Sequence, residues 1–178
     1  MPELDLMAVK EWGGHWVIRE QYRPLAEKLV QKFPDKLDFA LTNNILFIED
    51  RESKAKSQGA TVCARTGKIP GLWGEVIQQM TGKAFTHFIM FFRKNIDQMS
   101  KEQFTALMYH ELRHIGPDGS LRKHHIEDWV EMVDKLGPNW AGTKATIADI
   151  LDDKIIKWDD IQGPLSLFPE QNRLQVVK

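Results

Sequence analysis

The sequence predicts an α+β domain in which a small mixed sheet packs against one long amphipathic helix and further helices. Residues 85–92 (FTHFIMFF) form a continuous apolar run of strand length, which predicts a strand. Capping signals from Ser100 onward predict a long helix directly after it. The chain has 178 residues, of which 42% are hydrophobic and 28% charged, as is typical of one compact domain. We therefore expect residues 1–178 to form a single domain, with residues 163–178 as a loosely ordered tail.

The N-terminal half is expected to alternate helices and strands. Apolar residues recur at helical spacing before Pro34, which should stop that helix, and Pro24 is tolerable near its first turn. The expected elements, in chain order, are a helix over residues 21–33, a strand over 37–48 that is continuous or kinked at 43–44, a loop over 49–59, a strand over 60–65 and a helix over 72–80. The last helix carries an apolar stripe that we expect to pack in the core, formed by Trp73, Val76, Ile77 and Met80.

The second half begins with the best-defined helix. Ser100 and Gln103 make a capping-box pattern, and the helix should run from about 101 to 114 or 115. Gly and Pro at 116–119 predict a turn. A second helix is expected from near His124 to Leu136, and one more over residues 143–158.

The end of the helix after Ser100 carries a metal-binding pattern, His110-Glu111-Leu112-Arg113-His114. Helical residues four apart point in directions about 40° apart, so one metal ion can contact both imidazoles. Zinc binds neutral imidazole nitrogen, and a carboxylate beside the first ligand can reach a zinc-bound water. The pattern therefore predicts zinc (Zn²⁺) ligands at His110 and His114, with Glu111 as the catalytic base of peptide hydrolysis.

A third ligand should follow the turn at 116–119. The run from His124 to Trp129 offers several candidates, of which we favour His124, then His125, then Glu127. If these residues begin a helix, His124 shares a face with Glu127 and Asp128. Either of these two carboxylates could instead accept the free ring N–H of a ligating histidine. His125 could also polarise the scissile carbonyl.

Other readings of this pattern stay open at this point. Two histidines on a helix surface with a solvated Glu111 would need no metal at all. A non-catalytic, zinc-containing binding module would close its site with four protein ligands, for example by adding His124 and Glu127.

The amino-acid composition limits the classes of partner that the protein is expected to bind. Lys and Arg number 24 against 25 Asp and Glu, so the net charge of −1 gives no clear nucleic-acid signal. We expect no membrane association, because no apolar stretch is long enough to span a bilayer. The lone Cys63 and the acidic N-terminus are typical of a cytoplasmic protein. The predicted partner is a peptide or protein substrate.

The strand at 85–92 suggests how such a substrate could be held. If that strand lies at a sheet edge, it could pair with an extended peptide through main-chain hydrogen bonds. His87 within it is more typical of a structural histidine than of a catalytic one. The six tryptophans are spread along the chain and are expected to form core or pocket walls.

The stretch from Thr81 to Trp129 resembles the putative phage metallopeptidases, a zincin-like family of phages and prophages. The likeness lies in TGKAFTHFIMFFRKNIDQMSKEQFTALMYHELRHI and in HHIEDW, which is similar to the family's His-Asp-hydrophobic-Glu-Glu-aromatic element. The resemblance implies a zincin-like fold, metal ligands at His110, His114 and His124, and a catalytic base at Glu111. His125 stands where the family commonly has Asp, which makes it a rival for the third ligand. The family's origin also leaves open a non-catalytic zinc-containing binding module of phage or prophage origin, or a phage-encoded interaction protein that acts on a host DNA-associated factor.

Overall fold

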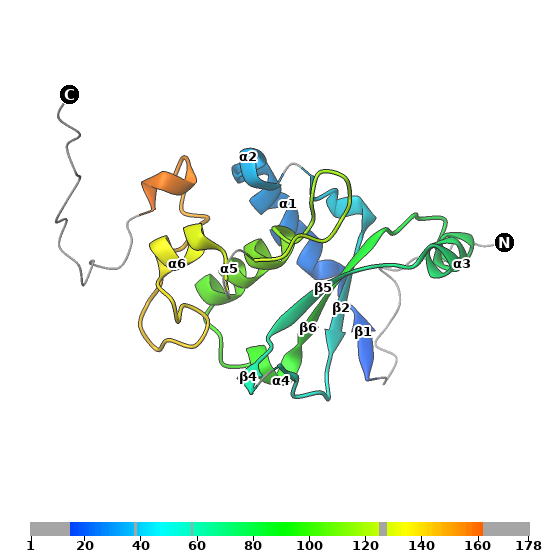
Figure 1. Cartoon of the computed structure of the whole chain (residues 1–178), viewed down its shortest axis with the longest axis horizontal. Coiled ribbons are helices and arrows are strands. Elements are labelled where there is room, and N and C mark those ends of the chain that lie inside the picture. Colours follow the sequence, from blue (N-terminus) through cyan, green and yellow to red (C-terminus); the bar gives the residue numbers. More distant parts are fainter. Residues whose placement is uncertain (1–14, 38, 58, 125–127, 162–178) are drawn as a thin grey trace, which may run out of the picture.

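The fold is built around a four-stranded mixed sheet (Figure 1). The structure, a computed structural model, describes residues 15–161 except 38, 58 and 125–127. The strand order is β1 (Trp16–Ile18), β2 (Ile45–Asp50), β6 (His87–Phe92) and β5 (Ala64–Lys68). β2 and β6 are parallel, whereas β1 and β5 run antiparallel to their neighbours. A separate two-stranded ribbon joins β3 (Lys56–Ser57) to β4 (Ala60–Thr61).

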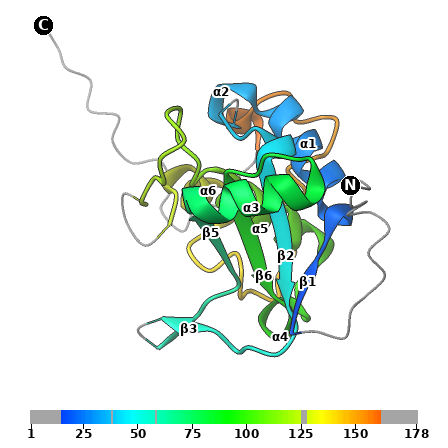
Figure 2. The ribbon, with the colours of Figure 1, turned by 90° about the vertical axis from the view of Figure 1, so that its right-hand side faces the viewer.

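Helices accompany the sheet on both faces. They are α1 (Arg23–Lys32), α2 (Pro34–Leu37), α3 (Gly71–Thr81), α4 (Arg93–Ile96), α5 (Lys101–Leu112) and α6 (Val130–Leu136). In the view of Figure 2, α3 lies in front of the strands. The α+β class with a small mixed sheet against a long helix is therefore confirmed. Within the described residues, no helix combines the length and the apolar character needed to cross a membrane.

The main core lies between the sheet and the pair α1 and α5. Alternate strand residues point into it because side chains alternate between the two faces of a sheet. They are Ile45, Phe47, Ala64, Ile89 and Phe91. The opposite face carries a smaller cluster around Leu46 and Phe85, against which Ile77 of α3 packs. Only one residue of α3, Thr81, is buried.

The exposed position of α3 corrects one prediction. Its apolar stripe does not pack in the core, since Trp73 is 59% exposed and Met80 is 57% exposed, and only Ile77 of the stripe packs against a cluster. Helical spacing identifies a stripe but not whether the sheet face beneath it is large enough to cover that stripe.

The N-terminal half follows the predicted alternation with shifted boundaries. α1 confirms the helix with Pro24 in its first turn. The strand expected over 37–48 is wrong in its first half, because Pro34 begins the short helix α2 and β2 starts at Ile45. Pro is well suited to the first turn of a helix, so it ends α1 and begins α2. The loop expected over 49–59 is shorter than predicted, since β2 runs on to Asp50 and β3 occupies Lys56–Ser57.

The helix α5 begins as the sequence predicts. The Ser100 hydroxyl accepts a hydrogen bond from the Gln103 backbone N–H, and the Gln103 side chain accepts one from the Ser100 N–H. Two N-terminal donors are thereby satisfied, which fixes where the helix starts. It ends at Leu112, so His114 lies just beyond its last residue.

The region after α5 differs most from expectation. The helix expected from near His124 begins only at Val130, and His124 itself lies in an irregular segment. The helix expected over 143–158 is also wrong, because that segment is made of turns and bends before a short 3₁₀ turn at Trp158–Asp160. Asx turns at Asp149 and Asp152, whose carboxylates accept backbone N–H groups two residues on, compete there with helix formation. The expected tail at 163–178 lies outside the described residues.

Candidate metal centre

Two histidines project from the end of α5. His110 is in the last helical turn and His114 follows the C-cap residue Arg113. Their ring centroids lie 5.2 Å apart. The helix end therefore places both imidazoles on one side, as the four-residue spacing predicts.

A tight turn brings the third histidine back to this helix end. Gly119 adopts a φ of 68°, a left-handed conformation that favours glycine, and the Ser120 carbonyl accepts the Gly116 N–H. Arg122 then forms two hydrogen bonds with His114. Its N–H donates to the His114 carbonyl at 2.7 Å, and its carbonyl accepts from His114 Nδ1 at 2.8 Å. His124 follows two residues later.

One donor atom from each of His110, His114 and His124 lies within 4.8 Å of the others. The Nε2 atoms of His110 and His124 are 3.0 Å apart. Because a carbonyl can only accept, the contact with Arg122 places the proton of His114 on Nδ1 and leaves Nε2 as a lone-pair donor. The cluster thus has the donor type and spacing of a metal site.

A carboxylate supports the first histidine. Asp128 Oδ1 lies 2.8 Å from His110 Nδ1, at an angle too bent for an ideal hydrogen bond, so the pair is a close electrostatic contact. The other oxygen of Asp128 accepts the indole N–H of Trp140 at 2.6 Å. Burial alone would raise the pKa of Asp128, but the contact with His110 opposes this effect. The pKa is lowered, and the carboxylate stays ionised. An outer carboxylate of this kind orients a ligating imidazole.

Trp129 forms the wall behind the three rings. It is fully buried, and its ring centroid lies 5.3 Å from that of His114 and 5.0 Å from that of His124. Its indole N–H donates to the His110 carbonyl at 3.0 Å. The guanidinium of Arg113 stacks over the same indole and is held by Glu131 at 2.7 Å. The imidazoles of His114 and His124 are therefore packed against a buried aromatic side chain.

Burial keeps the imidazoles of His114 and His124 neutral. It lowers the pKa of His114 to about 4, although the bond to the Arg122 carbonyl opposes the shift. Burial also lowers the pKa of His124, and neighbouring His110 adds to this effect. Neutral imidazole is the form that binds a metal ion.

Glu111 is buried beside the histidines. Its carboxylate Oε2 lies 2.7 Å from the hydroxyl of Thr66 on β5. Thr66 Oγ1 also lies 3.0 Å from the Glu111 carbonyl, and since a hydroxyl has one proton, we assign that proton to the shorter contact. Burial raises the pKa of Glu111, while His110 and Thr66 oppose the rise. A carboxylate with a raised pKa is suited to exchanging protons near neutral pH.

The sheet edge nearest this site is β5 and not the strand that the sequence suggested. β6, which forms the expected strand at 85–92, lies between β2 and β5, so the edge position considered for it is wrong. In an antiparallel pair, every second residue of a strand forms its backbone hydrogen bonds with the neighbouring strand. The Ile69 N–H donates to the Thr86 carbonyl, so residues 65 and 67 are the ones in β5 that bond to β6. The backbone groups of Ala64, Thr66 and Lys68 therefore face outward, where no strand of the described part pairs with them.

Sequence reasoning found some of these residues and missed others. It named His110, Glu111, His114 and His124, which the structure brings together, and it named Asp128 as a possible outer carboxylate. It missed Thr66, which lies 45 residues before Glu111 and carries no motif. The rival ligands His125 and Glu127 lie outside the described residues.

His87 supports the turn after α5. It is buried, and its Nε2 donates to the Gly119 carbonyl at 3.0 Å while Thr86 Oγ1 lies 2.9 Å from Nδ1. This geometry agrees with the structural role expected for it.

Comparison with known proteins identifies the family of the chain. A family model described as putative phage metallopeptidase matches residues 14–153. Neither the search of curated proteins nor the search of solved structures gave a match. The matched range includes the whole of α5, the turn after it and the histidine cluster. The chain therefore belongs to the putative phage metallopeptidase family, whose members are by that description metal-dependent proteases of phage.

Proposed function

We propose that this protein is a zinc-dependent metallopeptidase of the His-Glu-x-x-His type with a zincin-like site. His110, His114 and His124 would hold the metal, and Glu111 would act as the catalytic base. The observation that carries the proposal is the convergence of three imidazole nitrogens beside a buried carboxylate. The family match supports the reaction class.

The donor set suits zinc. Three neutral imidazoles with outer hydrogen-bond partners are a common catalytic zinc set, which leaves a coordination position for water or substrate. Two nitrogens of tetrahedral zinc, each about 2.0–2.1 Å from the metal, lie about 3.3 Å apart. The 3.0 Å between the Nε2 atoms of His110 and His124 is close to that separation.

A bound zinc ion would supply Lewis acidity, which polarises the scissile carbonyl and lowers the pKa of water at the site. Glu111 would accept one proton from the attacking water and later deliver it to the leaving amine, so that the carboxylate is regenerated. The Thr66 hydroxyl fixes the carboxylate in one rotamer, because it bonds Oε2 from the edge strand. Burial of Glu111 raises its pKa and makes the protonated form accessible between these two steps.

The edge of β5 offers a binding surface for an extended peptide. The outward backbone groups of Ala64, Thr66 and Lys68 can pair with a substrate strand through main-chain hydrogen bonds. Thr66 joins this edge directly to Glu111. A peptide paired there would pass the base, which explains how one strand can serve both binding and catalysis.

The test is a peptidase assay of zinc-loaded protein with the variant Glu111→Gln. Gln keeps the size of the side chain but cannot take up the proton, so we expect zinc content to stay unchanged and turnover to fall by about 10²-fold or more. Glu75→Gln on the exposed face of α3 is the matched control and should keep full activity. Full proteolysis by Glu111→Gln would overturn the role of Glu111.

A further inference from the structure

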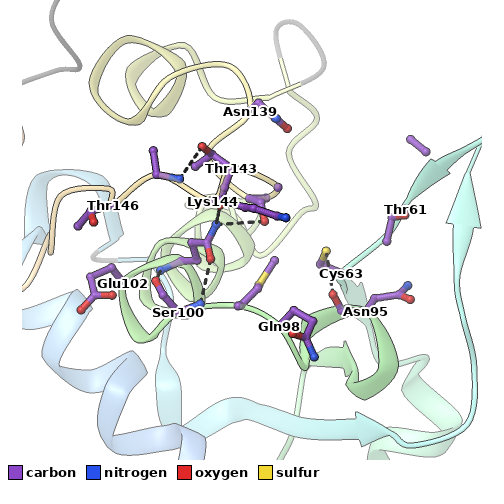
Figure 3. A pocket seen from close by; sticks show the side chains of 16 residues that line it. Thr61, Cys63, Asn95, Gln98, Ser100, Glu102, Asn139, Thr143, Lys144 and Thr146 are labelled. Carbon is purple, nitrogen blue, oxygen red and sulfur yellow. Dashed lines mark hydrogen bonds between the residues drawn. The ribbon is translucent and has the colours of Figure 1, made fainter.

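A large cavity lies beside the start of the edge strand β5 (Figure 3). Its volume is about 970 Å³. Its walls come from β4 and the residues after it, from α4 and the segment that joins it to α5, from the first turn of α5, and from the loop 139–146. The histidine cluster is not among its lining residues, so the cavity is a separate feature from the metal centre.

The cavity continues the proposed peptide-binding edge. Cys63 in its wall directly precedes β5 and lies three residues before Thr66, which contacts Glu111. Strands rise about 3.3 Å per residue, so the two positions are about 10 Å apart along the edge. The thiol is also near enough for Glu111 to contribute, after burial, to the raised pKa of Cys63. A peptide on the edge would therefore reach the cavity within about three residues of the scissile bond.

The loop 139–146, which lines the cavity, is linked by hydrogen bonds to α5 and to the carboxylate beside His110. Gln103 of α5 donates to the carbonyls of Trp140 and Thr143, both at 2.9 Å. Trp140 in turn donates to Asp128, the carboxylate beside His110. The same loop thus shapes the cavity and supports the histidine cluster, which fixes the distance between the two.

The direction of the bound peptide decides which side of the cleavage site enters the cavity. β5 is already antiparallel to β6, and we take the added strand to be antiparallel as well. The C-terminal part of such a peptide lies next to the N-terminal end of β5, where Cys63 and the cavity are. The cavity would then receive residues on the leaving-amine side of the scissile bond.

Among the residues that the structure describes, one cationic side chain lines the cavity, that of Lys144. Lys144 extends over it in Figure 3 and makes no ion pair with any residue that the structure describes. The acidic Glu102 points away from the centre of the cavity in the same view. Half-buried Cys63 and Met99 can pack against an aliphatic stem. The remaining polar groups are uncharged and come from Thr61, Asn95, Gln98, Ser100, Gln103, Asn139, Thr143 and Thr146.

We propose that this cavity is a specificity subsite for a carboxylate on the leaving-amine side of the cleaved bond, with Lys144 as its counter-ion. The inference rests on the proposed peptidase function. A carboxylate within about three residues of the cleavage site can come from an Asp or Glu side chain or from the C-terminus of a short peptide. Both sources share the chemistry that Lys144 recognises.

The experiment uses quenched fluorescent peptides with the zinc-loaded full chain. One pair of peptides differs by Glu or Gln in the three positions after the cleavage site, and a second pair differs by a free or an amidated C-terminus. We expect kcat/KM to favour the carboxylate form by about 5- to 10-fold in at least one pair, the size of effect of a charge-assisted contact. The pair that shows the preference identifies the source of the carboxylate.

Variants locate the preference at the cavity. Lys144→Ala should abolish it and Lys144→Glu should reverse it toward the uncharged peptide of the pair, while Lys154→Ala, another exposed lysine, should leave it unchanged. Equal rates within both pairs, or a preference that survives in Lys144→Ala, would overturn the subsite. Fluorescence anisotropy measures the binding of the same peptides to zinc-loaded Glu111→Gln. This measurement tests the subsite even without turnover. Carboxylate-selective binding without any cleavage by the wild type would therefore contradict the peptidase function and keep the subsite.

Discussion

The Nε2 atoms of His110 and His124 lie 3.0 Å apart, although the residues are 14 positions apart in the chain. Two neutral imidazoles that face each other with lone pairs repel unless a proton or a metal ion lies between them. His114 completes the cluster within 4.8 Å. The three side chains are thus arranged around one common position, and each should matter for metal binding.

Replacement of His124 is expected to remove one metal ligand. His124→Ala should lower the zinc content of purified protein from about one per chain to a small fraction, because two histidines alone bind zinc weakly. Metal analysis by mass spectrometry measures this directly. His15→Ala, whose imidazole contacts Asp50 far from the cluster in sequence, is the control and should retain zinc. Unchanged zinc in His124→Ala would show that another residue is the third ligand.

The outer carboxylate should tune metal affinity without being a ligand. Asp128→Asn removes the negative charge 2.8 Å from His110 Nδ1, and loss of such a partner commonly weakens metal affinity about 10- to 100-fold. Competition with a chelator measures the affinity. Asp134→Asn changes a carboxylate whose side chain is 69% exposed and should have no effect. Equal affinities for the two variants would contradict the role of Asp128.

Thr66 should set the protonation behaviour of Glu111. Thr66→Val keeps the shape of the side chain but removes the hydroxyl that lies 2.7 Å from Oε2. Because that bond favours the ionised carboxylate, its loss should raise the pKa of Glu111 further and move the acidic limb of the kcat/KM profile to higher pH. Thr66→Ser should restore the profile, whereas a purely structural role would change activity equally at every pH.

His87 should make stability depend on pH. Burial lowers its pKa below 6.5, with a further contribution from Lys68, while the bond to the Gly119 carbonyl opposes the shift. The unfolded chain therefore takes up a proton at higher pH than the folded one, and stability is lost as pH falls through about 6.5 towards the folded pKa. Denaturant titrations at pH 7.5 and about 5.5 measure this loss, with zinc kept bound.

His87→Gln is the matched variant for that measurement. Gln keeps a donor for the Gly119 carbonyl but does not titrate, so its free energy of unfolding should fall less between the two pH values. An identical pH dependence for wild type and His87→Gln would show that another group is responsible.

Local signals in the sequence were sufficient for α5. Its start depends on Ser100 and Gln103, which contact each other within one turn, and its metal motif depends on a four-residue spacing. The strand β6 was equally clear because a buried strand has to be apolar along its length. These features were predictable because the interactions that define them are close in sequence.

Features that depend on distant contacts could not be predicted. The partnership of Thr66 with Glu111 requires the strand order, which places β5 and not β6 at the edge. The exposure of Trp73 depends on how much of the sheet α3 covers. The late start of α6 follows the contacts of Asp128 and Trp129 with His110, which hold that segment out of a helix.

The most direct test of the proposed metal centre is a zinc-edge anomalous difference map from crystals of the zinc-loaded protein. Our account predicts one zinc ion bound by the Nε2 atoms of His110, His114 and His124 at about 2.0–2.1 Å, with a coordination position that no protein group fills. Zinc at another site, or zinc enclosed by four protein ligands, would contradict it.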